Sequence, residues 1–330
     1  MRSSSKPGYR TIPPQRQTAR RGWVALAIAL LWAPTSAQSP VVDADATLVE
    51  ELVVTARLPG PAWWRVSKGA SVVYVMGVPS LAPKHMDWDR ITFDRRMAGA
   101  KVVILPYAGL RVHITGAPGA LFGYLRLRSG RPFEETLDTV TRARFAAARA
   151  KLGQPADHYK VGNALAAALI LVNDYRDKQG LTTTDPTKLI RLLAQRARVP
   201  VQQKSYDLGP LVGAITRTPQ TAARTCLDEV MSAVEAGPGG TRAASRAWAT
   251  GEVAAALESE RSYERCLAVT PGAQAFDTKT KLDQVAQIEA ALATPGHSIA
   301  LVQLRPLLAQ GGVLDRLRAA GYEIKTPGEE

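Results

Sequence analysis

WWRVSKGASVVYVMG, residues 63–77, decides the fold class because it contains two β-rich runs separated by a turn. Trp63–Val66 and Ser71–Met76 are rich in the aromatic and β-branched residues that strands favour. Lys68-Gly69 lies between the runs and supplies the glycine that a tight turn uses. The stretch therefore predicts a β-hairpin at the start of the folded part of the chain.

Further strands are predicted on both sides of a helical middle. Lys101–Leu105 and Leu110–Thr115 follow the hairpin, and Ser298–Gln303 and Tyr322–Lys325 lie near the C-terminus. Strands at both ends of the chain must share a sheet if they are to bury their apolar faces. The sequence therefore predicts an α+β (mixed α/β) fold, with a central β-sheet from N- and C-terminal strands and a largely helical middle.

Helical periodicity fills the segment between these strands. The predicted helices cover residues 132–151, 158–178, 185–198, 219–235, 241–259, 278–293 and 312–320. Pro132, followed by two glutamates, suits the first turn of a helix. Asp185 is predicted to cap the third helix, with Pro186 in its first position. The apolar run Ala164–Val172 is nearly continuous, so the second helix is expected to be buried.

A basic and then apolar leader precedes the folded part. Residues 1–37 carry six positive charges and no acid, and Trp23–Ala33 is an apolar run of 11 residues. A bilayer needs about 20 apolar residues to be crossed, so this run is too short. With small residues before Gln38, the pattern predicts a signal peptide over residues 1–37 and a periplasmic or secreted protein (Gram-negative-type export). No transmembrane span is then expected after cleavage; an uncleaved anchor is the alternative.

Composition narrows the function classes. The chain has 330 residues and a formal net charge of +13, which becomes +7 without the six charges of the leader. Aromatic residues make up 6% and none interleave with a basic run, so no nucleic-acid partner is expected. Only 4 His and 2 Cys are present, which excludes zinc fingers and dense disulfide scaffolds. Residues 38–61, ending in Pro59-Gly60-Pro61, are predicted to be a flexible linker before a single domain over residues 62–330.

The two cysteines, Cys226 and Cys266, form an even pair. In an oxidising compartment such a pair predicts one disulfide. Two buried free thiols are the alternative, because cysteine is often found in apolar cores.

Four short segments carry a resemblance to a known family. They are the Trp-led hairpin with Gly77-Val-Pro-Ser80 and Asp87-Trp88, then Gly180-Leu181 with Val199-Pro-Val201, then Trp248-Ala-Thr-Gly251, and last the tail Gly311–Tyr322. In this order and spacing the chain resembles the TraB/GumN family, which is related to the Tiki metallopeptidases, from about Ala62 to Pro327. The resemblance implies the family's mixed fold.

The resemblance also implies where a divalent-metal site would lie. In the family, two Gly-x-x-His loops and a glutamate after an early strand are taken to form it. Here Gly77 keeps the first glycine, but Ser80 stands in place of the first histidine and Leu105 in place of the glutamate. Gln303 and Pro306 fall where the second Gly-x-x-His loop belongs. Leucine and proline side chains cannot ligate a metal, so a degenerate site is expected, with no metal, no other cofactor and no catalytic residue.

Arg305 lies at the position of the family's second metal loop, after the predicted strand Ser298–Gln303. A guanidinium in that loop would keep the cleft electropositive and able to bind a carboxylate or phosphate. Tyr107 is expected to line the same cleft. The alternative for Arg305 is a solvated loop arginine.

Three functions are consistent with these patterns. The first is a non-catalytic binding module with a degenerate metal site. The second is a metal-dependent hydrolase or peptidase with a displaced site that uses His85, Asp87, Asp89 or another histidine. The third is an electrostatic binder of anionic envelope polymers or lipid head groups. For the protein as a whole, an anionic envelope component or a peptide is the expected partner.

Overall fold

The predicted hairpin forms the first two strands of the central sheet. β1 (Trp63–Lys68) pairs antiparallel with β2 (Ser71–Val78), and Trp63 lies opposite Met76. The computed structural model describes residues 43, 45–107, 110–111, 121, 125, 131–207 and 209–329. The predicted signal peptide over residues 1–37 and most of the predicted strand 110–115 lie outside these ranges.

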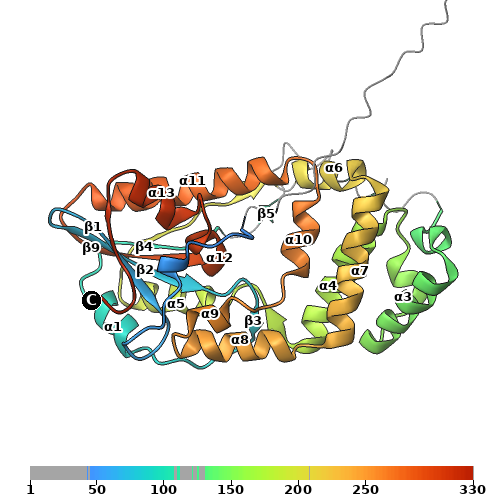
Figure 1. Cartoon of the computed structure of the whole chain (residues 1–330), viewed down its shortest axis with the longest axis horizontal. Coiled ribbons are helices and arrows are strands. Elements are labelled where there is room, and N and C mark those ends of the chain that lie inside the picture. Colours follow the sequence, from blue (N-terminus) through green and yellow to red (C-terminus); the bar gives the residue numbers. More distant parts are fainter. Residues whose placement is uncertain are drawn as a thin grey trace, which may run out of the picture. The chain divides into compact units, whose positions relative to one another are not determined.

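Six strands form one mixed sheet in the order β10-β1-β2-β9-β4-β7 (Figure 1). β9 (Gly296–Gln303) is central and runs parallel to both β2 and β4 (Val103–Ile104). β7 (Val201–Gln202) continues the parallel part, while β10 (Glu323–Lys325) pairs antiparallel with β1. Strands from both ends of the chain thus share the sheet, which confirms the predicted mixed fold.

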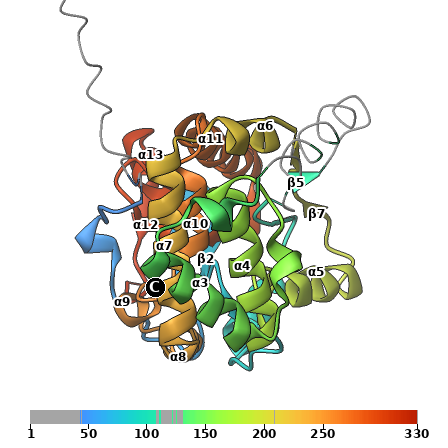
Figure 2. The same ribbon diagram turned by 90° about the vertical axis from the view of Figure 1, so that its right-hand side faces the viewer.

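Helices cover the sheet on two sides (Figures 1 and 2). α11 (Ala273–Leu292) and α13 (Val313–Ala319) lie along one side, and α8 (Gly239–Ala249) and α9 (Val253–Ala256) along the other. The sheet and these helices enclose the first hydrophobic core, to which α1 (Ile91–Met97) also belongs. Its Phe93 packs against tryptophan rings of the hairpin and of the loop that follows.

A second core is helical. Four helices pack around it: α3 (Thr139–Leu152), α4 (Ala164–Gln179), α7 (Gln220–Ala236) and α10 (Ser262–Ala268). They lie to the right of the sheet in Figure 1, with α10 nearest to it. The apolar run of α4 is largely buried, as its sequence predicts.

A disulfide links the α7 and α10 helices of this second core. Its partners are Cys226 and Cys266, which form the pair that the sequence predicts. Both residues are buried, at 2% and 0% exposure. The alternative of two free thiols is therefore excluded.

The remaining described elements are short. They are α5 (Thr187–Arg196), α6 (Gly209–Arg217), α12 (Leu304–Leu308), the 3-10 turns η1 (Glu50–Leu52), η3 (Phe133–Thr136) and η4 (Ala156–Tyr159), and the strand pairs β3 (Ala82–Pro83) with β6 (Leu181–Thr182) and β5 (Leu110–Arg111) with β8 (Tyr206–Asp207). Within the described ranges, no helix is long and apolar enough to cross a membrane.

Several helix boundaries differ from the predictions. The helix expected from Pro132 begins only at Thr139, because Asp138 caps it by accepting a hydrogen bond from the amide of Thr141. Asp185 does not cap α5; its carboxylate accepts a hydrogen bond from the backbone amide of His85. The helix predicted over residues 241–259 is split into α8 and α9 by a turn at Gly251, whose φ is 80°.

The segment predicted as a linker packs against the sheet core in its described part. Leu52 is fully buried, and its carbonyl accepts a hydrogen bond from the indole of Trp64 at 3.2 Å. The amide of Val49 donates to the carbonyl of Leu308, and Thr55 forms an isolated bridge with Glu252. The described residues from Asp43 onward belong to one compact unit, so the folded part begins before residue 62.

Candidate functional site

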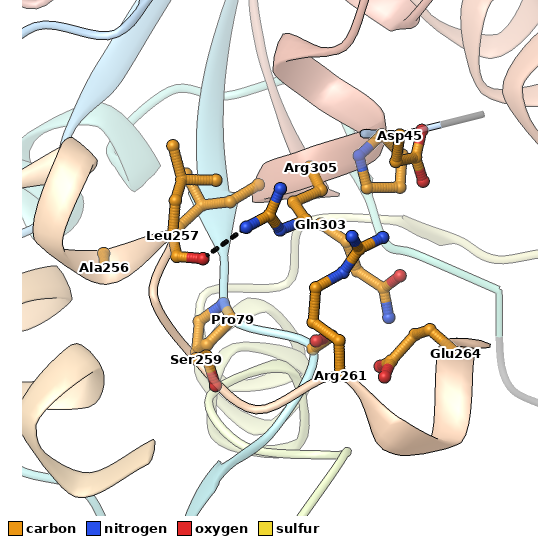
Figure 3. A pocket seen from close by; sticks show the side chains of 12 residues that line it. Asp45, Pro79, Ala256, Leu257, Ser259, Arg261, Glu264, Gln303 and Arg305 are labelled. Carbon is orange, nitrogen blue, oxygen red and sulfur yellow. Dashed lines mark hydrogen bonds between the residues drawn. The ribbon is translucent and has the colours of Figure 1, made fainter. Parts of the chain in front are cut away.

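A small cavity of about 50 Å³ lies where the loop after β2 meets the start of α12. Twelve residues line it: Asp45, Pro79, Ser80, Ala256, Leu257, Ser259, Arg261, Glu264, Gln303, Leu304, Arg305 and Pro306 (Figure 3). Four of the residues singled out in the sequence are among them: Ser80, Gln303, Arg305 and Pro306.

The register of two parallel strands brings the two sequence-predicted loops together. β2 and β9 run side by side with Val78 opposite Gln303. The segments that follow β2 and β9 therefore leave the sheet at the same edge, because the carboxyl ends of parallel neighbours lie side by side. Pro79-Ser80 after one strand and Leu304–Pro306 after the other then form facing walls of the cavity.

Gly77 has a packing role at this edge. A Cβ at this position would lie 2.4 Å from Cδ2 of Leu304 and 3.1 Å from the ring of Trp64. Real Cβ atoms do not approach so closely, so a larger residue would force the Leu304 side chain at the start of α12 to shift. The glycine therefore permits the close approach of the two loops, whatever group the cavity binds.

Arg305 lies in the first turn of α12, not in a loop as predicted. It is half-buried, and its Nη2 donates a hydrogen bond to the carbonyl of Leu257 at 2.7 Å (Figure 3). No carboxylate of the described residues lies within ion-pair distance of it. Burial, and then the positive charge of Arg261, lower the pKa of the Arg305 guanidinium.

Arg261 is a second cation in the cavity, and it was not predicted. It forms a bidentate ion pair with Asp43, with Nη1 2.7 Å from Oδ2 and Nη2 3.2 Å from Oδ1. Burial alone would raise the pKa of Asp43, but the hydrogen bond and charge of Arg261 hold it below its usual value. Next to it, Asp45 accepts a hydrogen bond from Lys281 at 2.6 Å.

Glu264 supplies a carboxyl group from α10, the helix that begins directly after Arg261 (Figure 3). Burial raises the pKa of this carboxyl. The positive charge of Arg176 and a hydrogen bond with the Ser80 side chain offset the effect only in part. Arg176 is itself buried, at 7% exposure, and stacks over the ring of Tyr263 at 4.2 Å.

Two residues expected near the cleft do not line the cavity. Leu105 is 1% exposed and belongs to the sheet core. Tyr107 packs edge-on against Tyr206 and Phe276, at ring distances of 5.7 Å and 6.1 Å. Burial raises the pKa of the Tyr107 hydroxyl to about 12. Tyr107, which was expected in the cleft with Arg305, is not among the residues that line this cavity, and its ring is held by this aromatic cluster.

A family model for the TraB/PrgY/gumN family matches residues 62–326, which is most of the chain. The chain belongs to the TraB/PrgY/gumN family. Searches of curated proteins and of solved structures found no match.

The divalent-metal site implied by the resemblance to the TraB/PrgY/gumN family does not fit this cavity. The described ranges contain no group of three or more His, Cys, Asp or Glu residues that could hold a metal ion. The cavity instead contains the guanidinium groups of Arg261 and Arg305, which repel a dication. Of its two carboxyl groups, Asp45 is held by Lys281, and burial raises the pKa of Glu264, which disfavours the charged form that a metal needs.

The residues near position 85 that were considered as alternative metal ligands make local contacts or are exposed. Asp89 accepts a hydrogen bond from the amide of Ile91 at 2.8 Å. His85 is exposed, and its described hydrogen bond uses the backbone amide, not the ring. His158 faces Asp174, and His297 contacts the carbonyl of Arg96. His113 lies outside the described residues.

Sequence reasoning missed Arg261 and Glu264 because they reach the cavity from a segment far along the chain. The signal available was local: residues 259–264 read SERSYE, a dense run of polar and charged residues directly before the buried Cys266. A charged run this close to a core residue marks a place where some charges can reach an internal surface, although most such residues face solvent.

Proposed function

We propose that this TraB/PrgY/gumN protein is a secreted or periplasmic, non-catalytic binding module whose degenerate metal site takes an anion. The observation that carries the proposal is Arg305, a half-buried guanidinium with no carboxylate of the described residues within ion-pair distance. Its place at the family's second metal loop means that a cation is retained where the family is taken to hold a metal.

The electrostatics of the cavity support an anionic ligand. A half-buried charge without a direct ion pair is costly, so Arg305 favours a ligand that brings a negative group. Burial is the main cause of the lowered pKa of its guanidinium, and the charges of nearby carboxylates offset it only in part. A planar guanidinium can bind a carboxylate or a phosphate through two parallel hydrogen bonds.

The export part of the proposal rests on residues 1–37. Their basic start, short apolar run and small residues before Gln38 favour secretion. N-terminal sequencing of the exported protein is expected to find Gln38 as the first residue. A chain that retains its leader would favour the alternative of a membrane anchor.

The binding experiment is calorimetric titration of the purified protein with inorganic phosphate and with succinate. At least one of them is expected to bind, and Arg305→Gln is expected to weaken binding at least tenfold. Arg196→Gln is the matched control, because Arg196 is exposed on α5 and away from the cavity residues. Equal affinities for the wild type and Arg305→Gln would contradict the proposal.

The competing function, a metal-dependent hydrolase or peptidase with a displaced site, is tested on the same protein. Metal analysis is expected to find no stoichiometric metal, and a mixture of peptides is expected to remain intact with or without added Mn²⁺ or Co²⁺. Tightly bound metal together with peptide hydrolysis would replace the binding proposal by the hydrolase.

A further inference from the structure

Two aspartates from the N-terminal segment reach the cations around the cavity. Asp43 pairs with Arg261 through both carboxylate oxygens, and Asp45 lines the cavity and pairs with Lys281. Asp277 shares the same lysine at 2.7 Å. The chain therefore already brings carboxylates to the region in which the anion site is proposed.

The Asp43–Arg261 pair is asymmetric in its burial. The side chain of Arg261 is 9% exposed and that of Asp43 is 31% exposed. The guanidinium is thus a fixed part of the wall, while the carboxylate approaches it from the more open side. Arg305 lies near enough for its charge to act on Asp43, and Figure 3 shows the two guanidinium groups beside each other.

Backbone hydrogen bonds tether the residues that follow the aspartates. The amide of Gln310 donates to the carbonyl of Thr47, and the amide of Val49 donates to that of Leu308, both at 2.9 Å. A carboxylate held a few residues from such an anchor has an effective concentration in the millimolar range or above. An external anion must therefore compete with Asp43 for the same guanidinium.

We propose that Asp43 is an internal occupant of Arg261, the second guanidinium of the cavity beside Arg305, and that the external ligand is an acidic peptide segment whose carboxylate displaces it. The proposal rests on the proposed function and names its ligand class. A carboxylate is favoured over a phosphate because the bidentate geometry at Arg261 is already satisfied by one. The spacing of Asp43 and Asp45 further indicates that two carboxylates two residues apart match Arg261 and Lys281.

When the ligand is an acidic peptide, the binding of Asp43 to Arg261 lowers the affinity of the protein for that peptide. While Asp43 is bound, only the fraction of molecules with Arg261 free can accept the peptide, so the apparent affinity is lowered by that fraction. Removing the charge of Asp43 removes this competition and leaves the cations of the cavity in place.

The test is fluorescence anisotropy with a labelled acetyl-Asp-Ala-Asp-amide peptide and a matched acetyl-Asn-Ala-Asn-amide peptide. Asp43→Asn is expected to bind the acidic peptide at least tenfold more tightly than the wild type does. Asp157→Asn is the control for net charge, because Asp157 is exposed in η4. It is expected to change the affinity less than twofold, and the Asn peptide is expected not to bind.

Asp43→Glu is the second variant, since Asp43→Asn leaves a buried guanidinium unpaired and can lower stability. Glutamate keeps the charge but displaces the carboxylate by one methylene, so a severalfold gain in affinity is expected. If both variants bind the acidic peptide as the wild type does, while Arg305→Gln still weakens binding, this inference is wrong and the proposed function stands. If neither the wild type nor the variants bind any of the anions, both fail.

Discussion

The indole N–H of Trp248 donates a hydrogen bond to the carbonyl oxygen of Gly77, across 2.6 Å and inside the core. The two residues are 171 positions apart in the sequence and belong to two of the segments that carry the family resemblance. The bond joins α8 to the end of β2, immediately before the loop that contributes Pro79 and Ser80 to the cavity. A helix far along the chain therefore fixes the strand end from which the cavity wall begins.

Trp248→Phe is expected to lower the free energy of unfolding by about 1–3 kcal/mol, because it leaves the buried Gly77 carbonyl without its donor. Urea unfolding measures the loss. Trp88→Phe is the matched control: the two rings are 5.7 Å apart, but no hydrogen-bond partner in the described structure accepts from the buried indole N–H of Trp88. If both substitutions cost the same, the hydrogen bond has no particular role.

Leu52→Ala is expected to cost about 2–5 kcal/mol, the usual loss for a leucine truncated in a core, because Leu52 is fully buried. Leu58→Ala, in the same segment but 40% exposed, is expected to change the stability by less than about 0.5 kcal/mol. Thermal or urea unfolding of the two variants makes the comparison. Equal small effects would show that residues 45–61 are only a linker.

Replacing both Cys226 and Cys266 by alanine is expected to destabilise the protein by about 4 kcal/mol, since the disulfide closes a loop of 40 residues in the unfolded chain. The loss should be visible as a lower midpoint of urea unfolding. Dithiothreitol should destabilise the wild type in the same direction and leave the double variant unchanged. A variant as stable as the wild type would mean that the second core does not depend on this bond.

Asp283 gives the protein a pH-dependent contribution to stability. Burial alone would raise the pKa of its carboxyl, but hydrogen bonds from Lys204, Lys279 and Tyr206 lower it to about 2. Because the folded pKa is below the unfolded value of 3.8, the contribution is present above pH 4 and is lost as the pH falls towards 2.

Asp283→Asn should therefore be less stable than the wild type at pH 6, and the difference should shrink at pH 2.5. Urea midpoints at both pH values measure it, and Asp157→Asn, exposed in η4, serves as the reference. A difference that grows on acidification would contradict the assignment.

The sheet was predictable because its strands follow local rules. The turn at Lys68-Gly69 and the β-rich runs around it define β1 and β2, and the apolar run before Gln303 defines β9. β6 and β8 are two-residue strands, too short to carry a period. α10 was missed because it has only seven residues, and one of its charged side chains, Glu264, lines the cavity instead of facing solvent.

The candidate site was predictable in part. The family resemblance pointed to Ser80, Gln303, Arg305 and Pro306, which the parallel register of β2 and β9 brings together. The charged run at residues 259–264 was visible in the sequence, but no local rule could place its side chains at this cavity. They depend on the packing of α10 beside α12 and of the N-terminal segment over both, and these are contacts between distant parts of the chain.

The burial of Leu52 also means that the limits of family similarity are not the limits of the folding unit. The family match begins at residue 62, whereas the fully buried Leu52, a member of the sheet core, lies ten positions earlier. A recombinant fragment trimmed to residues 62–326 would lack this core side chain and leave the indole of Trp64 without its acceptor. Such a fragment is expected to aggregate, and a soluble one should begin before Asp43.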